Sequence, residues 1–372
     1  MRKYALHAFM LLVTAGSAHA DNLYKGEQRI VVDGYPAVVR YFAGDPQKPL
    51  VVFSAGAHHT ARISYGGHPG ARSQDFIAYW LNKLGYNFLA VSYPIETTSG
   101  FIDAKPTPDF NAQKWGQQVA QAAKLATIEH HLSGHVVLLN WSMAGKVLQP
   151  AFKAASAAGL TVDGAIAMVA TPGITGFVPN QELKKTSSGY ADRRDMYGRW
   201  LKQIAVENAD NGGREIIPES VYRSDYVGDI PVGLEGYGEV YKGGKFEIDD
   251  LAQATDYGAF EFANYPLIAI LQDNSALDAE HGLVDRYWWG TYNVETFLNR
   301  VKKAGVDFSS ISQPEWHKIS DLSEKMNDQL TIRIDGNHFF FVGEKGASRT
   351  AEAVDLAIRR LSEFNKDVDT IK

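Results

Sequence analysis

The sequence contains no cysteine among its 372 residues. This absence excludes a thiolate nucleophile, a disulfide framework and a metal site built on thiolates. An excess of basic residues is also missing, because 37 Lys and Arg stand against 43 Asp and Glu, a formal net charge of −6. A chain with this charge has no electrostatic attraction to nucleic acid, so we expect no nucleic-acid partner.

Long hydrophobic runs are missing after the first twenty residues, so we expect no transmembrane segment in the mature chain. Residues 1–20 have Arg2 and Lys3, then an apolar stretch that is shorter than a membrane span, and they end in AHA. This order is typical of a secretory signal peptide, and a membrane anchor is the alternative. Cleavage after Ala20 would remove both basic residues, change the net charge from −6 to −8, and leave an exported protein, periplasmic or secreted.

What is present is a regular alternation of apolar and amphipathic segments. Two strands at 27–42, joined by the hairpin signal Asp33-Gly34, are followed by strands at 49–56, 87–94, 135–140 and 163–172. Helical patterns lie between these strands, at 73–85, at 112–132 and after Ser142, where Pro150 should kink or shorten the helix. The pattern resumes with strands at 265–273 and 330–338 and with helices near 293–304 and 348–364.

This alternation predicts an α/β fold with a doubly wound, mostly parallel sheet. The alternation stops at residues 173–264, where the clearest element is a helix at about 191–206. We therefore expect a core formed by residues 21–172 and 265–372, with 173–264 inserted as a cap. A second long segment, 274–328, separates the last two strands.

The stretch HVVLLNWSMAGKVLQPAF, residues 135–152, places Ser142 directly after a buried strand. In a parallel sheet the functional loops lie at the carboxyl ends of the strands. Ala144 and Gly145 are small enough to let the next helix pack closely against the strand. A serine here is therefore a candidate nucleophile, and a serine that only caps the helix is the alternative.

The segment from Asn140 to Gly145 resembles the nucleophile elbow, G-x-S-x-G, of the α/β-hydrolase superfamily. Asn140 and Ala144 stand where the family has glycines. The resemblance implies a serine hydrolase with Ser142 as nucleophile. The insertion at 173–264 resembles, by its position, the cap that many members of this superfamily carry.

The same resemblance implies the partners of the serine. The family places the general base after the last strand, where GNH ends in His338; a capping or core histidine is the alternative. It places the acid after the strand before, where Asp273 and Asp278 flank the expected position. We prefer Asp273 because it lies closer to the strand end; either aspartate could instead be a turn residue.

Backbone N–H groups should stabilise the oxyanion. The resemblance implies the amide of Met143 and, in the loop after the strand at 49–56, the amide of Ala57. His58, His59 and His68 lie in or near this loop. A metal site is one interpretation, but no further ligands stand at suitable spacing. We expect these histidines to line the pocket or to orient the loop, with no metal and no cofactor.

We interpret the chain as an exported serine hydrolase that cleaves ester-type bonds in a small-molecule or acyl-ester substrate through an acyl-enzyme. The alternatives are a serine peptidase or amidase, a non-catalytic binding protein that kept the fold, and a cell-envelope interaction protein. Aromatic residues of the insertion could line an apolar pocket or form the core of the cap: Tyr190, Tyr197, Trp200, Tyr222, Tyr226, Tyr237 and Tyr241. The sequence predicts no particular protein partner.

Overall fold

The computed structural model describes residues 22–102, 106–174 and 182–371. The predicted signal peptide therefore lies outside the described residues. An eight-stranded sheet forms the centre, in the order β1-β2-β4-β3-β6-β7-β12-β13. Its strands are β1 Glu27–Val32, β2 Tyr35–Phe42, β3 Leu50–Ser54, β4 Asn87–Ser92, β6 His135–Trp141, β7 Thr161–Met168, β12 Ile268–Asp273 and β13 Thr331–Ile334.

The direction of the strands confirms the predicted fold class. The six strands β4, β3, β6, β7, β12 and β13 run parallel to one another. β2 pairs antiparallel with β4, and β1 and β2 form the antiparallel hairpin expected at Asp33-Gly34. Every residue of β3, β4 and β12 is buried. Such continuous burial is expected for strands that are covered on both faces.

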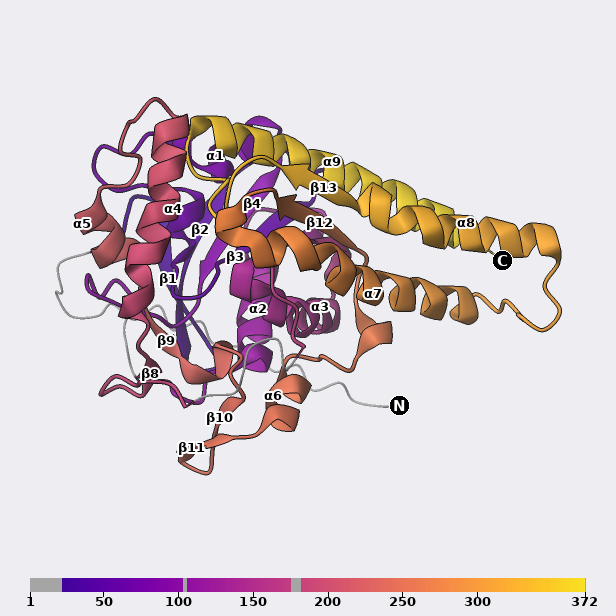
Figure 1. Cartoon of the computed structure of the whole chain (residues 1–372), viewed down its shortest axis with the longest axis horizontal. Helices are drawn as coiled ribbons and strands as arrows, with labels where there is room; N and C mark the ends of the chain where they lie inside the picture. The colour runs from indigo at the N-terminus through magenta and orange to yellow at the C-terminus, as the bar shows by residue number, and fades with distance from the viewer. Residues whose placement is uncertain (1–21, 103–105, 175–181, 372) are drawn as a thin grey trace.

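Helices cover the two faces of this sheet (Figure 1). α1 (Ile77–Lys83) packs against α9 (Glu344–Asp369), and α2 (Ala112–Glu129) packs against α3 (Leu148–Ala157). The chain moves outward from β3 to β4 through α1 and back across β3 to β6 through α2. Right-handed crossovers in opposite directions place the two helices on opposite faces of the sheet.

The segment between β7 and β12 forms its own small elements. They are β8 Tyr190–Ala191, α4 Tyr197–Asp210, α5 Glu219–Val221, β9 Gly228–Pro231, β10 Glu239–Lys242, β11 Lys245–Ile248 and α6 Asp250–Asp256. β9 also pairs with β5 (Glu96–Thr97), which precedes α2 in the core. The expected helix is present as α4. The division into a core and a cap at 173–264 stays a prediction.

The second long segment consists of two helices that extend beyond the sheet alongside α9 (Figure 1). α7 (Ala279–Lys303) is much longer than the helix predicted near 293–304, and α8 (Gln313–Leu330) was not predicted. Gly282 and Gly290 weaken the helical pattern of α7. A Cβ at Gly290 would lie 2.7 Å from Nδ2 of Asn327 on α8, so this glycine allows the two helices to approach. No helix in the described ranges has both the length and the apolar character needed to cross a bilayer.

Candidate active site

Ser142 lies on a sharp turn at the carboxyl end of β6. Its backbone φ is +55°, in the left-handed region that few non-glycine residues adopt. A 3₁₀ helix at Ser142–Val147 follows the strand, and α3 begins only at Leu148. Pro150 therefore falls in the first turn of α3, where a missing N–H is tolerated, and it does not interrupt the helix.

Two glycines make room for this turn. A Cβ at Gly56 would lie 2.7 Å from Cβ of Ser142, and a Cβ at Gly145 would lie 2.3 Å from the carbonyl oxygen of Thr171. Both distances are too short for a real side chain. The loop after β3 and the loop after β7 therefore approach the serine turn through positions that glycine alone can occupy without a shift of the backbone.

Asn140 occupies the position of the first glycine in the G-x-S-x-G elbow that this segment resembles. Its side chain is buried, and Nδ2 donates a hydrogen bond of 2.9 Å to the carbonyl oxygen of Ala144. The amide thus joins the end of β6 to the turn that follows Ser142. The bulkier residue fits here because it is part of the turn's own hydrogen bonding.

His338 lies in the loop after β13, and its imidazole points at the serine. Nε2 is 2.9 Å from Oγ of Ser142. The indole N–H of Trp141 donates to the carbonyl oxygen of His338 at 3.1 Å, and the two rings are 5.3 Å apart. The residue before the serine therefore helps to hold the backbone and the ring of the histidine.

The carboxyl group that contacts His338 belongs to Asp278. Oδ2 of Asp278 is 2.7 Å from Nδ1 of the imidazole. The prediction that Asp273 makes this contact is wrong in the structure: Asp273 is the last residue of β12, and its Oδ1 accepts the backbone N–H of Ser275. Ser275 caps a 3₁₀ turn, Ala276–Asp278, that carries the second aspartate to the histidine.

Ser142, Asp278 and His338 thus follow the carboxyl ends of β6, β12 and β13, in that order along the chain. A serine on a strained turn between a strand and a helix, followed along the chain by an acid and then a histidine, is characteristic of the α/β-hydrolase fold. The chain has the α/β-hydrolase fold. The order of its eight strands, with β2 as the antiparallel neighbour of β4, belongs to the same layout.

No family model and no curated protein matches the sequence. Solved structures do match it. An arylesterase is 13% identical, covering 92% of this chain and 83% of its own, with a TM-score of 0.42. An esterase from Rhodococcus sp. ECU1013 is 14% identical, covering 90% and 99%, with a TM-score of 0.44. An N-acyl homoserine lactone degrading enzyme is 10% identical, covering 88% and 99%, with a TM-score of 0.46. At identities of 10–14%, a shared activity does not follow from this similarity.

The charges around Asp278 favour its ionised form. Burial opposes ionisation, but the neighbouring His338 and His281 hold the pKa of Asp278 well below its usual range. Burial and the adjacent Asp278 carboxylate raise the pKa of Asp273 far above its usual range. Asp273 therefore keeps its proton at neutral pH, and Asp278 carries the negative charge next to the imidazole.

His281 is a further residue of this site that the sequence did not reveal. It lies on α7, and its ring is 5.2 Å from that of His338. Its Nδ1 is 3.0 Å from both carboxylate oxygens of Asp285, one turn further along the helix. Although burial lowers it, Asp285 raises the pKa of His281 to about 9. The i, i+4 spacing of a histidine and an aspartate was the signal, but this segment was not recognised as a helix.

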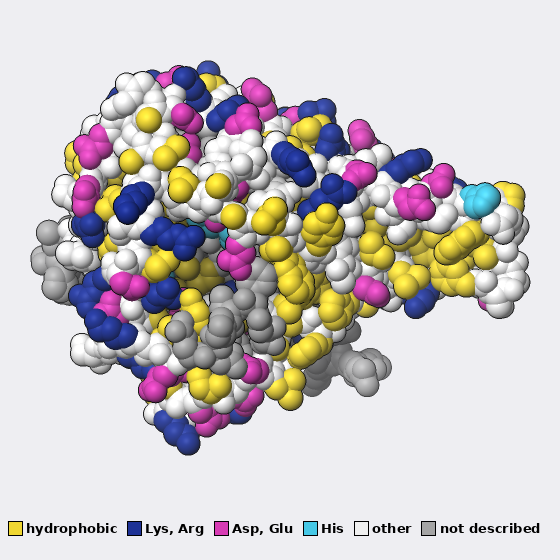
Figure 2. Space-filling model, in the orientation of Figure 1, with side chains coloured by type: hydrophobic (Ala, Val, Ile, Leu, Met, Phe, Trp, Pro, Cys, Tyr) yellow, Lys and Arg dark blue, Asp and Glu magenta, His cyan; other side chains and the backbone are white. Residues whose placement is uncertain are grey.

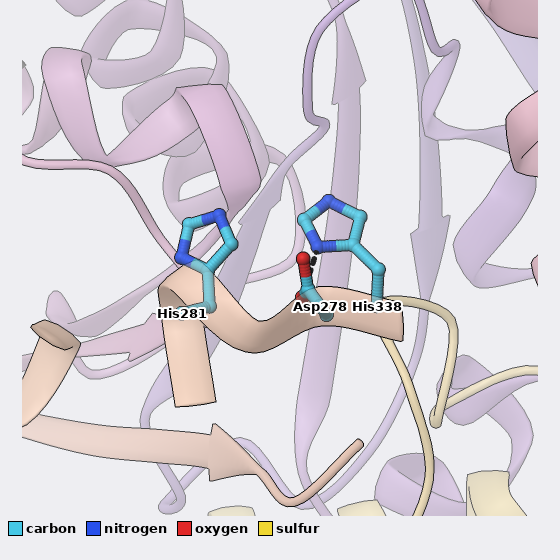
Figure 3. A group of neighbouring side chains, drawn as sticks. All are labelled: Asp278, His281 and His338. Carbon is cyan, nitrogen blue, oxygen red and sulfur yellow. Dashed lines mark hydrogen bonds and ion pairs between the residues drawn. The ribbon is translucent and has the colours of Figure 1, made fainter. Parts of the chain in front are cut away.

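Asp278, His281 and His338 are the residues of this site that could share a metal ion. Figure 3 shows the carboxyl group of Asp278 between the two imidazole rings, and the ligand atoms of the three lie within 4.8 Å of one another. However, both nitrogens of His338 and Nδ1 of His281 already have hydrogen-bond partners. An ion would have to replace those bonds.

The loop after β3 is held by its histidines. Nδ1 of His59 donates to the carbonyl oxygen of Ala57 at 2.7 Å, and its Nε2 lies 2.7 Å from the hydroxyl of Tyr222. Burial lowers the pKa of His59 to about 3, so the ring is neutral. Ala57 and Met143 both line the cavity beside Ser142. Their roles as oxyanion donors stay predictions. His58 and His68 contact other partners, Glu235 and Gly228 for the first and Tyr226 for the second.

A cavity of about 220 Å³ lies beside Ser142. Trp200, Tyr237 and Tyr257 of the 173–264 segment line it, whereas Tyr190, Tyr222 and Tyr226 are packed in the interior. Lys146, Arg193 and Arg199 also line the cavity. The sequence did not point to these three residues, because nothing in their spacing relates them.

Proposed function

We propose that the protein is a serine hydrolase that cleaves ester-type bonds through an acyl-enzyme. The observation that carries the proposal is the continuous hydrogen-bonded path from Oγ of Ser142 to Nε2 of His338, at 2.9 Å, and from Nδ1 to Asp278, at 2.7 Å. A serine hydroxyl within hydrogen-bonding distance of an imidazole that is oriented by a carboxylate is an activated nucleophile.

In the proposed reaction, Oγ of Ser142 attacks the carbonyl carbon while Nε2 of His338 takes the hydroxyl proton. Asp278 accepts the Nδ1–H bond throughout and stabilises the imidazolium that forms. The amides of Met143 and Ala57 would donate to the oxyanion. The imidazolium then protonates the leaving alcohol, and water, deprotonated by the same imidazole, releases the acid from Ser142.

Labelling of the purified protein with a fluorophosphonate tests this proposal. We expect one adduct, on Ser142, that is absent in Ser142→Ala and forms at least about a hundredfold more slowly in His338→Gln. Ser133→Ala is the matched control, since Ser133 is exposed and precedes β6. A folded protein that takes no label would favour a non-catalytic binding protein with this fold.

The amidase alternative is tested with pairs of substrates that share one acyl group and differ only in an ester or an anilide bond. Attack on the two bonds uses the same residues, so the ratio of kcat/KM within each pair decides between them. We expect the ester of each pair to be cleaved faster. A larger kcat/KM for the anilides would make the protein an amidase.

Export is part of the same proposal. The signal-like residues 1–20 predict that the mature protein begins at Asp21. Expression of the full chain in a Gram-negative bacterium, with cell fractionation and N-terminal sequencing, measures this. Protein that stays in the cytoplasm with an intact N-terminus would contradict it.

A further inference from the structure

We propose that the cavity beside Ser142 binds a carboxylate of the substrate through Lys146 and Arg193, so that the preferred substrates are esters that carry a free carboxylate. This inference rests on the proposed function and names its substrate class. The two side chains come from different parts of the chain, and both line the cavity that contains Ser142 and His338.

Lys146 is four residues after Ser142, in the 3₁₀ helix that follows the serine. Its Nζ donates a hydrogen bond of 2.5 Å to the carbonyl oxygen of Glu235. An ammonium group has three N–H donors, and this is the hydrogen bond that the described residues give it. Burial lowers the pKa of Lys146 to about 8, which is the effect of a cation with too little compensating charge.

Gly236 allows the loop at 235–237 to pack directly on this ammonium. Its φ is +89°, and a Cβ there would lie 2.4 Å from Nζ of Lys146. Arg193 approaches the same loop, because Nη1 donates to the hydroxyl of Tyr237 at 2.9 Å. The loop therefore holds both cationic groups at the wall of the cavity.

Two carboxylates lie near these cations: that of Glu235 is buried, and that of Asp195 is exposed, with Oδ1 3.9 Å from Nε of Arg193. The Glu235 carboxylate contacts Nε2 of His58, and it is 3.7 Å from Nη1 of Arg193. Burial opposes its ionisation, but His58, Arg193 and Lys146 lower the pKa of Glu235. Glu235 is the buried acidic residue that Lys146 and Arg193 share, while Asp195 is exposed to solvent, so an incoming carboxylate would gain charge-assisted hydrogen bonds from both cations.

Basic side chains also lie near the mouth of the cavity. Figure 2 shows Lys and Arg side chains gathered over α4, next to a hollow in this face of the molecule. Arg199 on α4 lines the cavity and is exposed. Glu280 is also at the rim, while Asp278 is already bonded to His338. Arg199 and Glu280 are thus one cation and one anion at the rim, and an anionic substrate would be held by Lys146 and Arg193 inside the cavity.

Two pairs of substrates test the inference, each differing only in one carboxylate. The first is the mono-p-nitrophenyl ester of adipic acid against the corresponding adipamic acid ester, with the charge on the acyl side. The second is 3-acetoxybenzoate against 3-acetoxybenzamide, with the charge on the leaving group. We expect kcat/KM to be at least about tenfold larger for the carboxylate in one pair or both.

Arg193→Gln and Lys146→Met should each bring that ratio to within about threefold of one, and Arg193→Lys should retain more of it, because it keeps the charge. The ratio is measured within each variant, so a general loss of activity cancels. Arg359→Gln on α9 and Lys325→Met on α8 are matched controls that should keep the ratio of the native protein. Arg193 is half-buried, so its variants keep the test valid if Lys146→Met does not fold.

The outcomes separate this inference from the proposed function. If Ser142 takes the fluorophosphonate label but neither pair shows a preference for the carboxylate, the cavity is not an anion site and the hydrolase proposal stands. A preference that is unchanged in both Arg193→Gln and Lys146→Met would equally overturn the assignment. If Ser142 takes no label and neither pair is hydrolysed, the proposed function itself fails.

Discussion

Asp273 and Asp278 are five positions apart and are both buried, yet they have different environments. Asp278 is bonded to His338 and lies near the imidazolium of His281, so it is ionised. Asp273 has no cation in contact with it among the described residues, and its carboxyl group instead meets the Asp278 carboxylate. At neutral pH the two residues therefore hold one negative charge between them, and it is on Asp278.

Substitution by asparagine distinguishes the roles of the two aspartates in catalysis. Asp278→Asn should lower kcat toward an activated ester by about 10³–10⁴-fold, because the imidazole loses the carboxylate that fixes its tautomer. Asp273→Asn should lower kcat by less than about tenfold, since an amide resembles the protonated carboxyl group that is present. Steady-state kinetics with circular dichroism as the folding control measures both. A larger loss in Asp273→Asn would assign the acid to Asp273.

The sequence pointed to Ser142 and His338, whose side chains the structure brings to 2.9 Å from each other, but not to the carboxyl group that contacts the imidazole. Ser142 follows a buried strand and precedes small residues, and the resemblance to the α/β-hydrolase superfamily implied His338 because it follows the last strand. The choice between the two aspartates depends on a short 3₁₀ turn, capped by Ser275, that brings Asp278 back over the strand end. Such a turn has no periodicity that a sequence could show.

Among the elements, the turn from β6 into α3 depends on close packing at Gly145. The carbonyl oxygen of Thr171 and the indole ring of Trp289 both lie against Gly145, at 2.3 and 2.9 Å from the position that a Cβ would take there. The backbone N–H of Thr171 also donates to the carbonyl oxygen of Ser142. The serine turn is therefore fixed between β7 and α7, as well as by its own strand.

Gly145→Ala should destabilise the fold by about 1–3 kcal/mol, since the new methyl group has no space. Gly198→Ala is the matched control: Gly198 lies in α4, and apart from its chain neighbours and the backbone of its own helix no described residue has an atom within 4 Å of the Cβ position. Alanine there should stabilise the fold by about 0.5–1 kcal/mol. Urea unfolding of the two variants measures the difference. Equal stabilities would mean that the packing at Gly145 is looser than the structure has it.

Helices and strands were predicted correctly where the hydrophobic pattern is continuous. The prediction failed where packing against other elements determines the secondary structure. β3, β4 and β6 are short buried runs, and α2 has a long amphipathic pattern, so each was predicted within a few residues. α7 was predicted only at its end. Its first half contains two glycines and a mixture of polar and aromatic residues, and it is helical because it packs on β12 and α8.

For the whole molecule, several buried ionisable groups hold protons that the unfolded chain would release. Burial raises the pKa of Glu207 to about 7, and Asp285 raises that of His281 to about 9. A group with a raised pKa stabilises the fold at low pH, and this contribution is lost as the pH rises through the folded-state value. Burial lowers the pKa of Lys146 to about 8. The folded protein therefore releases this proton before the unfolded chain does, and the free energy of unfolding rises with pH mainly above pH 8.

The free energy of unfolding should therefore fall as the pH rises from 6.5 to 8. Glu207→Gln removes one of the titrating groups, so the fall in this variant should be smaller by about 1 kcal/mol over the same window. Urea unfolding at several pH values measures both slopes. Identical slopes for the native protein and the variant would show that Glu207 is ionised in the folded state.

The measurement that tests the central claim most directly is capture of the acyl-enzyme by rapid acid quench and mass spectrometry. The tryptic peptide of residues 125–146 contains Ser133 and Ser142, so fragmentation must locate the acyl group. We predict that its mass increases by one acyl group, on Ser142, within the first turnover of a p-nitrophenyl ester. The increase should be unchanged in Ser133→Ala and absent in Ser142→Ala. Turnover of the ester with no acyl group on Ser142 at any quench time, and undiminished in Ser142→Ala, would contradict the account.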